Sequence, residues 1–336
     1  MLLPQHTYHR PDSLAECLDK LAHLDAGSVE GADRLARVQV IAGGTDVIFN
    51  MRLRLFQPEN LVSIRSLPEL QQVETLADGS LRIGAACRLI DLADNPLVCD
   101  RYPALKSAID AVASVHIRNI GTLGGNICLE TRCWYTNNSE EWRKGRAGCF
   151  KTDCEQCHVI PSSHTCHAIN NADTPLALIA LDAVLTIQSA GGQREVPIAD
   201  FYRPDGIEHM DLRAGELLTH VTIPPCTDRT VFIKFTPRRG MDFSLGAVAA
   251  RCDGTGQDAK KVSIVIGSIS TAPVVLDAPC RLLEKQGLSD RAIAGAVAAI
   301  RDEMGEVTNL YGRATYKKQI AKTLVRRALV ALREQR

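Results

Sequence analysis

Six of the 12 cysteines in this chain lie within one segment of 39 residues at positions 128–166. The segment reads CLETRCWYTNNSEEWRKGRAGCFKTDCEQCHVIPSSHTC and also contains four aromatic residues, Trp134, Tyr135, Trp142 and Phe150. This composition is not that of a disordered segment. In a reducing cytoplasm, clustered cysteines bind metal or carry out redox chemistry more often than they form disulfides. We therefore expect a bound metal centre to order the segment.

The spacing of these cysteines leaves the identity of the metal open. Cys154 and Cys157 form a C-x-x-C pair, which can hold one zinc ion from a single turn. A further ligand could come from a nearby histidine: His158, His164 or His167. The residues by themselves favour zinc and rank a disulfide framework last. The other cysteines are isolated and are interpreted as small core residues: Cys17, Cys87, Cys99, Cys226, Cys252 and Cys280.

Two glycine loops are candidates for binding an anion. The first is AGGTD (Ala42, Gly43, Gly44, Thr45 and Asp46), and the second is TLGGN (Thr122, Leu123, Gly124, Gly125 and Asn126). Adjacent glycines let successive backbone N–H groups converge on a phosphate, although a tight turn explains a glycine pair equally well. Neither loop fits the Rossmann or P-loop pattern. The two loops lie about 80 residues apart, so together they could hold one pyrophosphate from both sides.

The elements that must position these loops alternate between helix and strand. Ser13 caps a predicted helix over residues 13–24, whose apolar stripe is Leu14, Cys17, Leu18, Leu21 and Leu24. The first glycine loop interrupts an apolar run over residues 38–49, and residues 81–93 are interpreted as a strand that leads into a helix. A helix over about 103–115 precedes the second loop.

The second half of the chain shows the same mixture. A helix and then a hairpin that turns at Gly191 and Gly192 are predicted over residues 171–201, and Pro224 and Pro225 mark a domain boundary. Two strands follow, VFIKFTP and VSIVIGSIS, and then two helices, one over residues 289–304 and one from about 315. The basic side chains of the last helix are expected to form a solvated face. The fold class is therefore α+β or α/β.

Bulk composition excludes some partners. The 39 lysines and arginines balance the 39 aspartates and glutamates, so nothing indicates nucleic acid or an anionic membrane surface. No apolar run reaches the 18 or so residues of a membrane helix, and the start of the chain lacks the apolar core of a signal peptide. We therefore expect a cytoplasmic protein of two or three domains.

Four segments, in this order, resemble the FAD-binding subunit of the xanthine dehydrogenase and carbon monoxide dehydrogenase family of molybdenum hydroxylases: IAGGTDVI, RIGAACRL, IRNIGTLGGNI and DTPLALIALDA. The resemblance implies an α+β fold, with a PCMH-like FAD-binding domain of two α/β subdomains over residues 1–224 and a small α+β C-terminal domain over residues 229–336. It also implies that both glycine loops hold the FAD pyrophosphate and neighbouring groups. Asp173 matches a family aspartate that hydrogen-bonds the cofactor, and Lys234 matches a lysine near the flavin. The alternatives are a helix-capping Asp173 and a surface Lys234.

The cysteine segment is similar to a loop in the flavoprotein subunit of the 4-hydroxybenzoyl-CoA reductases, which holds a 4Fe–4S cluster. The pattern there is C-x15-C-x7-C-x8-C, and the cysteines that reproduce it without a gap are Cys133, Cys149, Cys157 and Cys166. Within this resemblance, the iron–sulfur loop is an insertion at about residues 128–168. Cys128 would then lie in the cofactor-binding segment, and Cys154 would be a spare thiol.

The function that this resemblance implies is electron transfer, without substrate chemistry in this chain. The expected cofactors are FAD and a 4Fe–4S cluster, and the expected partners are a 2Fe–2S subunit, a molybdopterin subunit and ferredoxin, assembled as a dimer of heterotrimers. The implied reaction of the complex is reductive removal of the ring hydroxyl of 4-hydroxybenzoyl-CoA. Two alternatives remain open: an oxidative molybdenum hydroxylase subunit, and a zinc-stapled flavin-binding scaffold.

Overall fold

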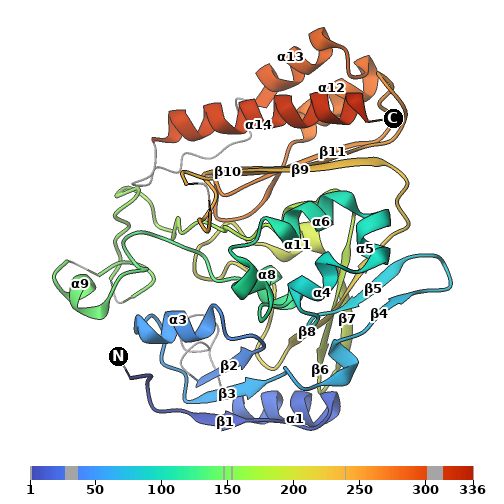
Figure 1. Ribbon diagram of the computed structural model, residues 1–336. Helices are drawn as coiled ribbons and strands as arrows, with labels where there is room; N and C mark the ends of the chain where they lie inside the picture. Colours follow the sequence, from blue (N-terminus) through green and yellow to red (C-terminus); the bar gives the residue numbers. More distant parts are fainter. Residues whose placement is uncertain are drawn as a thin grey trace.

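The computed structural model describes residues 2–26, 37–146, 148–152, 154–238, 240–300 and 313–335. Over these residues the chain forms three β-sheets with helices packed between and around them (Figure 1). The α+β fold class is confirmed. Within the described parts of the chain, no helix combines the length and apolar character that crossing a membrane requires.

The N-terminal part is built on a small parallel sheet of order β1-β3-β2. Its elements are β1 (Thr7–His9), α1 (Leu14–Leu24), β2 (Val38–Ile41), α3 (Val47–Arg52) and β3 (Asn60–Ser63). Helix α1 begins where the sequence predicts, because the Ser13 hydroxyl accepts a hydrogen bond from the Glu16 N–H. Cys17 and Leu21 of its apolar stripe are buried. The second half of the apolar run around the first glycine loop is helical, so β2 leads through that loop into α3.

The second part is an antiparallel sheet of five strands in the order β4-β5-β8-β6-β7. Its strands are β4 (Val73–Thr75), β5 (Leu81–Gly84), β6 (Val184–Ser189), β7 (Gly192–Pro197) and β8 (Leu217–Ile223). The hairpin between β6 and β7 turns at Gly191 and Gly192, as predicted. These strands are antiparallel, whereas those of the N-terminal sheet are parallel, so the chain contains both kinds of sheet.

Short helices cover this antiparallel sheet. They are η1 (Pro68–Leu70), α4 (Leu89–Ala93), α5 (Pro96–Arg101), α6 (Pro103–Asp110), α7 (Val115–Arg118), α8 (Leu123–Ile127), α10 (Thr174–Ala180) and α11 (Ile198–Phe201). The helix predicted over 103–115 ends at Asp110, because Ala113 has a left-handed backbone with φ of 43° and a new helix then starts at Val115. Every residue of α10 is buried, since it lies between the second part and the C-terminal sheet.

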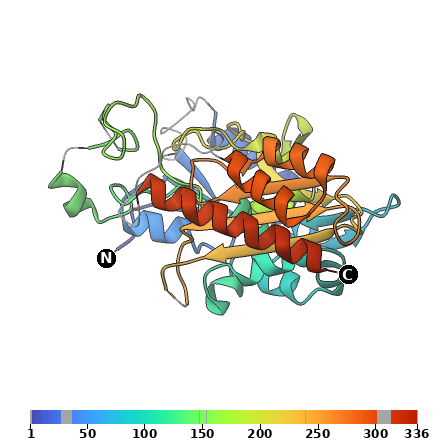
Figure 2. The same cartoon turned by 90° about the horizontal axis from the view of Figure 1, so that it is seen from above.

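The C-terminal part is an antiparallel sheet of order β12-β11-β10-β9. Its elements are β9 (Arg229–Phe235), β10 (Gly246–Cys252), β11 (Val262–Gly267), β12 (Val274–Val275), α12 (Asp277–Gln286), α13 (Asp290–Ala299) and α14 (Ala314–Glu334). Figure 2 shows α14 lying across this sheet. On α14, Lys318, Lys322 and Arg326 are at least partly exposed, as predicted, whereas Lys317 is buried.

Every residue of β10 is buried, because α14 packs against it on one side and α10 on the other. The C-terminal sheet is therefore bound to the second part along a largely buried surface.

Four of the isolated cysteines are buried as predicted, namely Cys17, Cys87, Cys252 and Cys280, while Cys99 and Cys226 are half-buried.

One buried cation joins these two parts. Arg251 of β10 is 4% exposed, and its guanidinium lies 2.6 Å from a carboxylate oxygen of Asp182, in the turn before β6, and 3.5 Å from one of Asp228. We expect Arg251→Ala to lower the free energy of unfolding by about 1.5–3 kcal/mol, the usual contribution of a hydrogen bond to a charged group.

The matched control is Lys261→Ala. Lys261 also contacts Asp182, at 3.1 Å, but its side chain is 63% exposed, so the loss should stay below about 1 kcal/mol. Denaturant unfolding of both variants measures the difference, and equal losses would show that Arg251 does not join the two parts.

Candidate functional site

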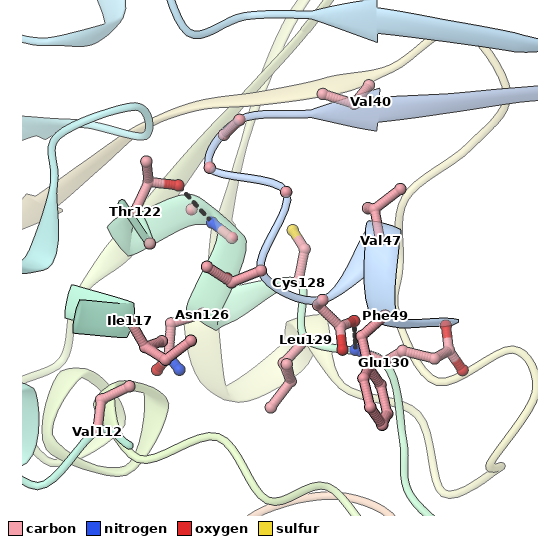
Figure 3. A pocket seen from close by; sticks show the side chains of 18 of the residues that line it. Val40, Val47, Phe49, Val112, Ile117, Thr122, Asn126, Cys128, Leu129 and Glu130 are labelled. Atoms are coloured by element: carbon pink, nitrogen blue, oxygen red, sulfur yellow. Dashed lines mark hydrogen bonds between the residues drawn. The ribbon is translucent and has the colours of Figure 1, made fainter. Parts of the chain in front are cut away.

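A cavity of about 500 Å³ opens where the three parts of the chain meet. Its walls come from the first glycine loop and α3, from the segment around α8, and from residues 234–243 of the C-terminal part. Figure 3 shows Thr122 and Asn126 on one side and Val47 and Phe49 of α3 on the other. This volume lies within the usual range for small-molecule and cofactor sites.

The first glycine loop is pressed against the second. A side-chain carbon on Gly43 would lie 2.1 Å from the carbonyl oxygen of Ile120, so only glycine fits there. Gly44 has φ of 72°, which is strained for any residue with a side chain. The loop thus needs glycine at both positions, at one for close approach and at the other for backbone conformation.

Backbone N–H groups of the first loop are free to bind a ligand. The four successive groups of residues 43–46 donate no hydrogen bond to any residue that the structure describes. All four residues line the cavity. Unpaired, convergent N–H groups are the donor set that binds phosphate oxygens in backbone nests.

The second glycine loop is fixed by its own hydrogen bonds. The Thr122 hydroxyl accepts from the Gly125 N–H at 3.1 Å, and the Gly124 N–H donates to the Ala85 carbonyl at 2.8 Å. The Asn126 side-chain oxygen accepts from both the N–H and the hydroxyl of Thr174, which ties α8 to the start of α10. This loop is therefore a rigid wall of the cavity.

Of the ten predicted glycine-loop residues, nine line the cavity: Ala42, Gly43, Gly44, Thr45, Asp46, Thr122, Gly124, Gly125 and Asn126. Leu123 does not line the cavity, because it is the first residue of α8 and its side chain is completely buried in the core. Cys128, predicted to lie in the cofactor-binding segment, does line the cavity.

Asp173 and Lys234 form an ion pair in the cavity wall. The Lys234 ammonium lies 2.7 Å from Asp173 Oδ2 and also donates to the Ala111 carbonyl at 2.9 Å. Both side chains are at most 10% exposed, so the alternative of a surface lysine is wrong. Asp173 precedes α10 but its carboxylate makes no capping hydrogen bond, so the capping alternative is also wrong. Burial raises the pKa of Asp173 to about 6, and Lys234 opposes that rise.

One carboxylate oxygen of Asp173 has no hydrogen-bond partner among the described residues. Asp173 Oδ1 is buried and accepts no hydrogen bond within the described structure. An unpaired buried carboxylate oxygen is costly, and the cost is removed by a donor that enters the cavity. Asp173 is thus placed to accept a hydrogen bond from a ligand.

The cavity wall also contains charged residues that were not foreseen from the sequence, and Arg132 and Glu130 are two of them. Arg132 forms an ion pair with Asp46, and Glu130 lies 2.5 Å from the ammonium of Lys151. Burial raises the pKa of Asp46, and Arg132 opposes that rise. Burial also acts to raise the pKa of Glu130, but Lys151 and His209 outweigh it and hold the pKa below its ordinary value. Both carboxylates are thereby neutralised beside the cavity.

The cysteine loop leaves the cavity wall at a single neck. The backbones of Arg132 and Ile169 exchange two hydrogen bonds of 2.8 Å, which close the intervening loop. Within it lies one short helix, α9 (Glu140–Lys144). The N–H of Ile160 points at the Cys157 sulfur at 3.4 Å, and that of Ala168 at the Cys166 sulfur at 3.5 Å. Backbone donors of this kind are among the features that tune iron–sulfur sites.

The pKa of Cys133 responds to the charges of neighbouring cysteines. Burial raises the pKa of the Cys133 thiol, and the charges of Cys149 and Cys157 raise it further. Burial raises the pKa of Cys166 to about 12, and Cys133 is among the groups that add to that rise. Burial thus favours the protonated thiols of Cys133 and Cys166, and a metal centre bound by their thiolates would have to displace these protons.

The described residues do not form a site for a single metal ion. Among them, no group of three or more histidine, cysteine, aspartate or glutamate side chains is close enough to hold one ion. Four ligands of one zinc must all lie within about 2.3 Å of it. In a 4Fe–4S cluster each thiolate binds a different iron, so the sulfurs stand farther apart. The geometry of the thiols therefore decides neither for zinc nor for the cluster.

Comparison with known proteins assigns the chain to a family. Residues 4–226 match the FAD-binding domain of molybdopterin dehydrogenases, and residues 232–332 match the C-terminal domain of the CO dehydrogenase flavoprotein. The chain is 31% identical to the aldehyde oxidoreductase FAD-binding subunit PaoB of Escherichia coli K12, over 98% of each chain. The chain belongs to the FAD-binding subunits of the molybdenum hydroxylase family.

Other relatives agree with this assignment. The carbon monoxide dehydrogenase medium chain of Hydrogenophaga pseudoflava is 28% identical over 98% of each chain. Among solved structures, CO dehydrogenase from Oligotropha carboxidovorans matches with a TM-score of 0.80 at 22% identity, over the whole of both chains. Quinoline 2-oxidoreductase from Pseudomonas putida 86 matches with a TM-score of 0.78 at 24% identity, over 99% of each. The fold of this FAD-binding subunit is therefore that of the family.

The cavity of this FAD-binding subunit suits FAD. Free N–H groups in the first glycine loop match the need of a pyrophosphate, and the unpaired Asp173 oxygen matches a donor on the cofactor. The chemistry of the cavity wall therefore fits FAD, the cofactor that this family binds.

Gly43→Ala tests the contact between the two glycine loops. The added methyl would overlap the Ile120 carbonyl, so the loops must separate and FAD affinity should fall by at least about tenfold, or about 1.4 kcal/mol. Titration of the FAD-free chain, followed by quenching of flavin fluorescence, measures this loss.

Gly191→Ala serves as the control for that substitution. The nearest atom to a methyl at Gly191, in the β6–β7 turn, is 3.7 Å away. FAD affinity should stay unchanged in this variant. An unchanged affinity in Gly43→Ala as well would refute the role of the loop contact.

Proposed function

We propose that this subunit transfers electrons between FAD and a 4Fe–4S cluster held by Cys133, Cys149, Cys157 and Cys166. Two observations support the cluster: the spacing of the four cysteines, and backbone N–H groups aimed at the sulfurs of Cys157 and Cys166. The spacing carries the most weight, because it reproduces a four-cysteine pattern without a gap. FAD converts between two-electron and one-electron transfer, whereas such a cluster passes single electrons.

We propose that both glycine loops hold the FAD pyrophosphate and that Asp173 and Lys234 contact the flavin side of the cofactor. The free N–H groups of residues 43–46 support the first assignment, and the unpaired Asp173 oxygen supports the second. Asp46 would act indirectly, because its carboxylate is paired with Arg132 and would otherwise repel a phosphate.

The partners follow from the family. The chain is one subunit of a molybdenum hydroxylase-type oxidoreductase, and relatives carry names such as medium chain or FAD-binding subunit. We propose a 2Fe–2S subunit and a molybdopterin subunit as its partners, in a cytoplasmic dimer of heterotrimers. Reduced ferredoxin is the proposed external electron carrier, since the cysteine loop projects from the body of the molecule (Figure 1).

The proposed reaction of the complex is reductive dehydroxylation of 4-hydroxybenzoyl-CoA to benzoyl-CoA. Its support is the cysteine spacing alone, because no acyl-CoA site is expected in this subunit. The second candidate is an oxidative hydroxylase, which the names of relatives such as aldehyde oxidoreductase and carbon monoxide dehydrogenase favour. Turnover of the whole complex on 4-hydroxybenzoyl-CoA with a low-potential donor, compared with aldehyde or xanthine and an oxidant, decides between them.

Replacing single cysteines tests the ligand set. Cys149→Ser should remove the iron and the acid-labile sulfide, together with the broad brown absorption that bleaches on reduction. Cys154→Ser, five residues away, should retain the cluster, because Cys154 lies outside the pattern. Iron and sulfide analysis of anaerobically purified chain measures both. Loss of iron from Cys154→Ser but not from Cys157→Ser would show that the ligand set is wrong.

The pH dependence of FAD binding tests the role of Asp173. The pKa of Asp173 is raised from 3.8 to about 6 in the folded, FAD-free chain. The folded chain therefore binds this proton more tightly than the unfolded chain does. As a consequence, the free energy of unfolding of the FAD-free chain falls as the pH rises between these two values. A donor on FAD favours the ionised carboxylate. We therefore expect FAD affinity to increase as the pH rises through about 6.

Asp173→Asn provides the comparison for this pH dependence. The amide does not titrate, so its FAD affinity should be weaker and independent of pH over the same range. FAD affinity is measured for both proteins by fluorescence titration, at pH values that extend roughly one to two units on either side of the transition. Identical pH profiles would exclude contact between Asp173 and the cofactor.

A further inference from the structure

Helix α3 connects the FAD cavity with the cysteine loop. It follows directly after the first glycine loop, and its residues Val47 and Phe49 line the cavity. Its hydrogen-bond partners outside the N-terminal part include two arginines of the cysteine loop and its neck, Arg132 and Arg143. The position of α3, and with it the position of the glycine loop, therefore depends on these two side chains.

Arg132 holds the start of the helix. Its guanidinium pairs with Asp46, the residue that precedes α3, and lies 5.5 Å from the ring centre of Phe49. On its other side, it lies 5.2 Å from the ring centre of Phe243 in the C-terminal part. Cation–π contacts of this kind contribute most where the groups are shielded from water, and the Arg132 side chain is only 13% exposed.

Arg143 of α9 holds the other end of the helix. It donates to the carbonyl of Leu53 at 2.8 Å and to that of Arg54 at 2.9 Å. The last carbonyls of a helix lack partners within it and carry partial negative charge, so a guanidinium is well suited to bind them. Arg54 also has a left-handed backbone with φ of 56°, a strained conformation that these contacts help to hold.

The same guanidinium is anchored beside the predicted metal ligands. Arg143 donates to the carbonyls of Asn138, at 2.5 Å, and Thr136, at 3.4 Å, in the turn that follows Cys133. The hydroxyl of Thr136 in turn lies 3.5 Å from the Cys149 sulfur. A short chain of hydrogen bonds thus runs from the Cys149 thiol through Thr136 and Arg143 to the end of α3.

We propose that the cysteine loop supports FAD binding. Arg132 and Arg143 hold α3 in position, and metal binding in the loop is thereby coupled to FAD binding in the cavity. This inference rests on the proposed function for the identity of both cofactors. Ordering of the loop by its metal centre places Arg143 against α3, which holds the first glycine loop in its FAD-binding position. Because coupling between sites is reciprocal, bound FAD must stabilise the loaded loop by the same factor.

The test compares two neighbouring residues of α9 in the full-length chain. Arg143 does not line the FAD cavity, so Arg143→Ala can change FAD affinity only through the loop and α3. We expect a loss on the order of tenfold, within the usual range of coupling between sites. Arg143→Lys should lose less FAD affinity than Arg143→Ala, because a lysine keeps the positive charge. It should still lose some, because its single nitrogen cannot replace the planar fork of the guanidinium.

Lys144→Ala is the matched control. The Lys144 side chain is 72% exposed and its ion pair is with Glu140 of the same helix, 2.9 Å away. Its FAD affinity should equal that of the unaltered chain. FAD affinity is measured by fluorescence quenching and the fold by circular dichroism, before and after removal of iron with a chelator.

Iron removal should weaken FAD binding in the unaltered chain and in Lys144→Ala, but only slightly in Arg143→Ala, because the coupling is already lost there. Bound FAD should likewise slow iron release to the chelator in every protein except Arg143→Ala. Equal FAD affinities for Arg143→Ala and Lys144→Ala would overturn the inference. A wild-type chain that contains neither iron nor sulfide would instead refute the proposed cluster, and the comparison of the two variants would still decide whether the loop supports the FAD site.

Discussion

The close contact between two glycine loops is the constraint on which the rest of this structure depends. Gly43 lies against the Ile120 carbonyl with no room for a side chain, and this contact joins the N-terminal part to the second part at the base of the cavity. Close approach of two backbones excludes side chains from this part of the cavity wall, where the N–H groups of residues 43–46 donate to no described residue. The cavity is therefore a consequence of how these loops pack.

Charge in and around the cavity is arranged in pairs. Asp46 is neutralised by Arg132, Glu130 by Lys151, and Asp173 by Lys234. The Asp46–Arg132 pair joins the N-terminal part to the second part, and the Asp173–Lys234 pair joins the second part to the C-terminal part, so contacts that remove repulsion from an anionic cofactor also hold the three parts together. Among the buried carboxylate oxygens of the described residues, only the second oxygen of Asp173 is left unpaired. That exception lies where a cofactor can satisfy it.

Much of the fold and of the candidate site followed from local patterns. Ser13 and its apolar stripe predicted α1, and the glycine pair at 191–192 predicted a hairpin, because capping and turn formation depend on residues a few positions apart. The glycine loops were recognisable for the same reason. That the Leu123 side chain lies in the core and not in the cavity wall could not be read from the TLGGN segment, because the packing of α8 decides it. Whether strands pair in parallel was equally hidden, since β5 pairs with β8 across more than a hundred residues of chain.

The sequence by itself indicated the FAD chemistry through two glycine loops in a family-specific order and an aspartate and a lysine that accompany them. The spacing C-x15-C-x7-C-x8-C of four cysteines is the basis of the proposed cluster. Tertiary structure alone decided which charges meet. Arg132, Arg143 and Lys151 carry no motif, and their partners Asp46, Leu53 and Glu130 lie between 21 and 90 residues away in the chain. A hydrogen bond or ion pair between such residues depends on how the parts pack, and no local pattern encodes that packing. The same packing places the cysteine loop against α3 and so beside the FAD cavity.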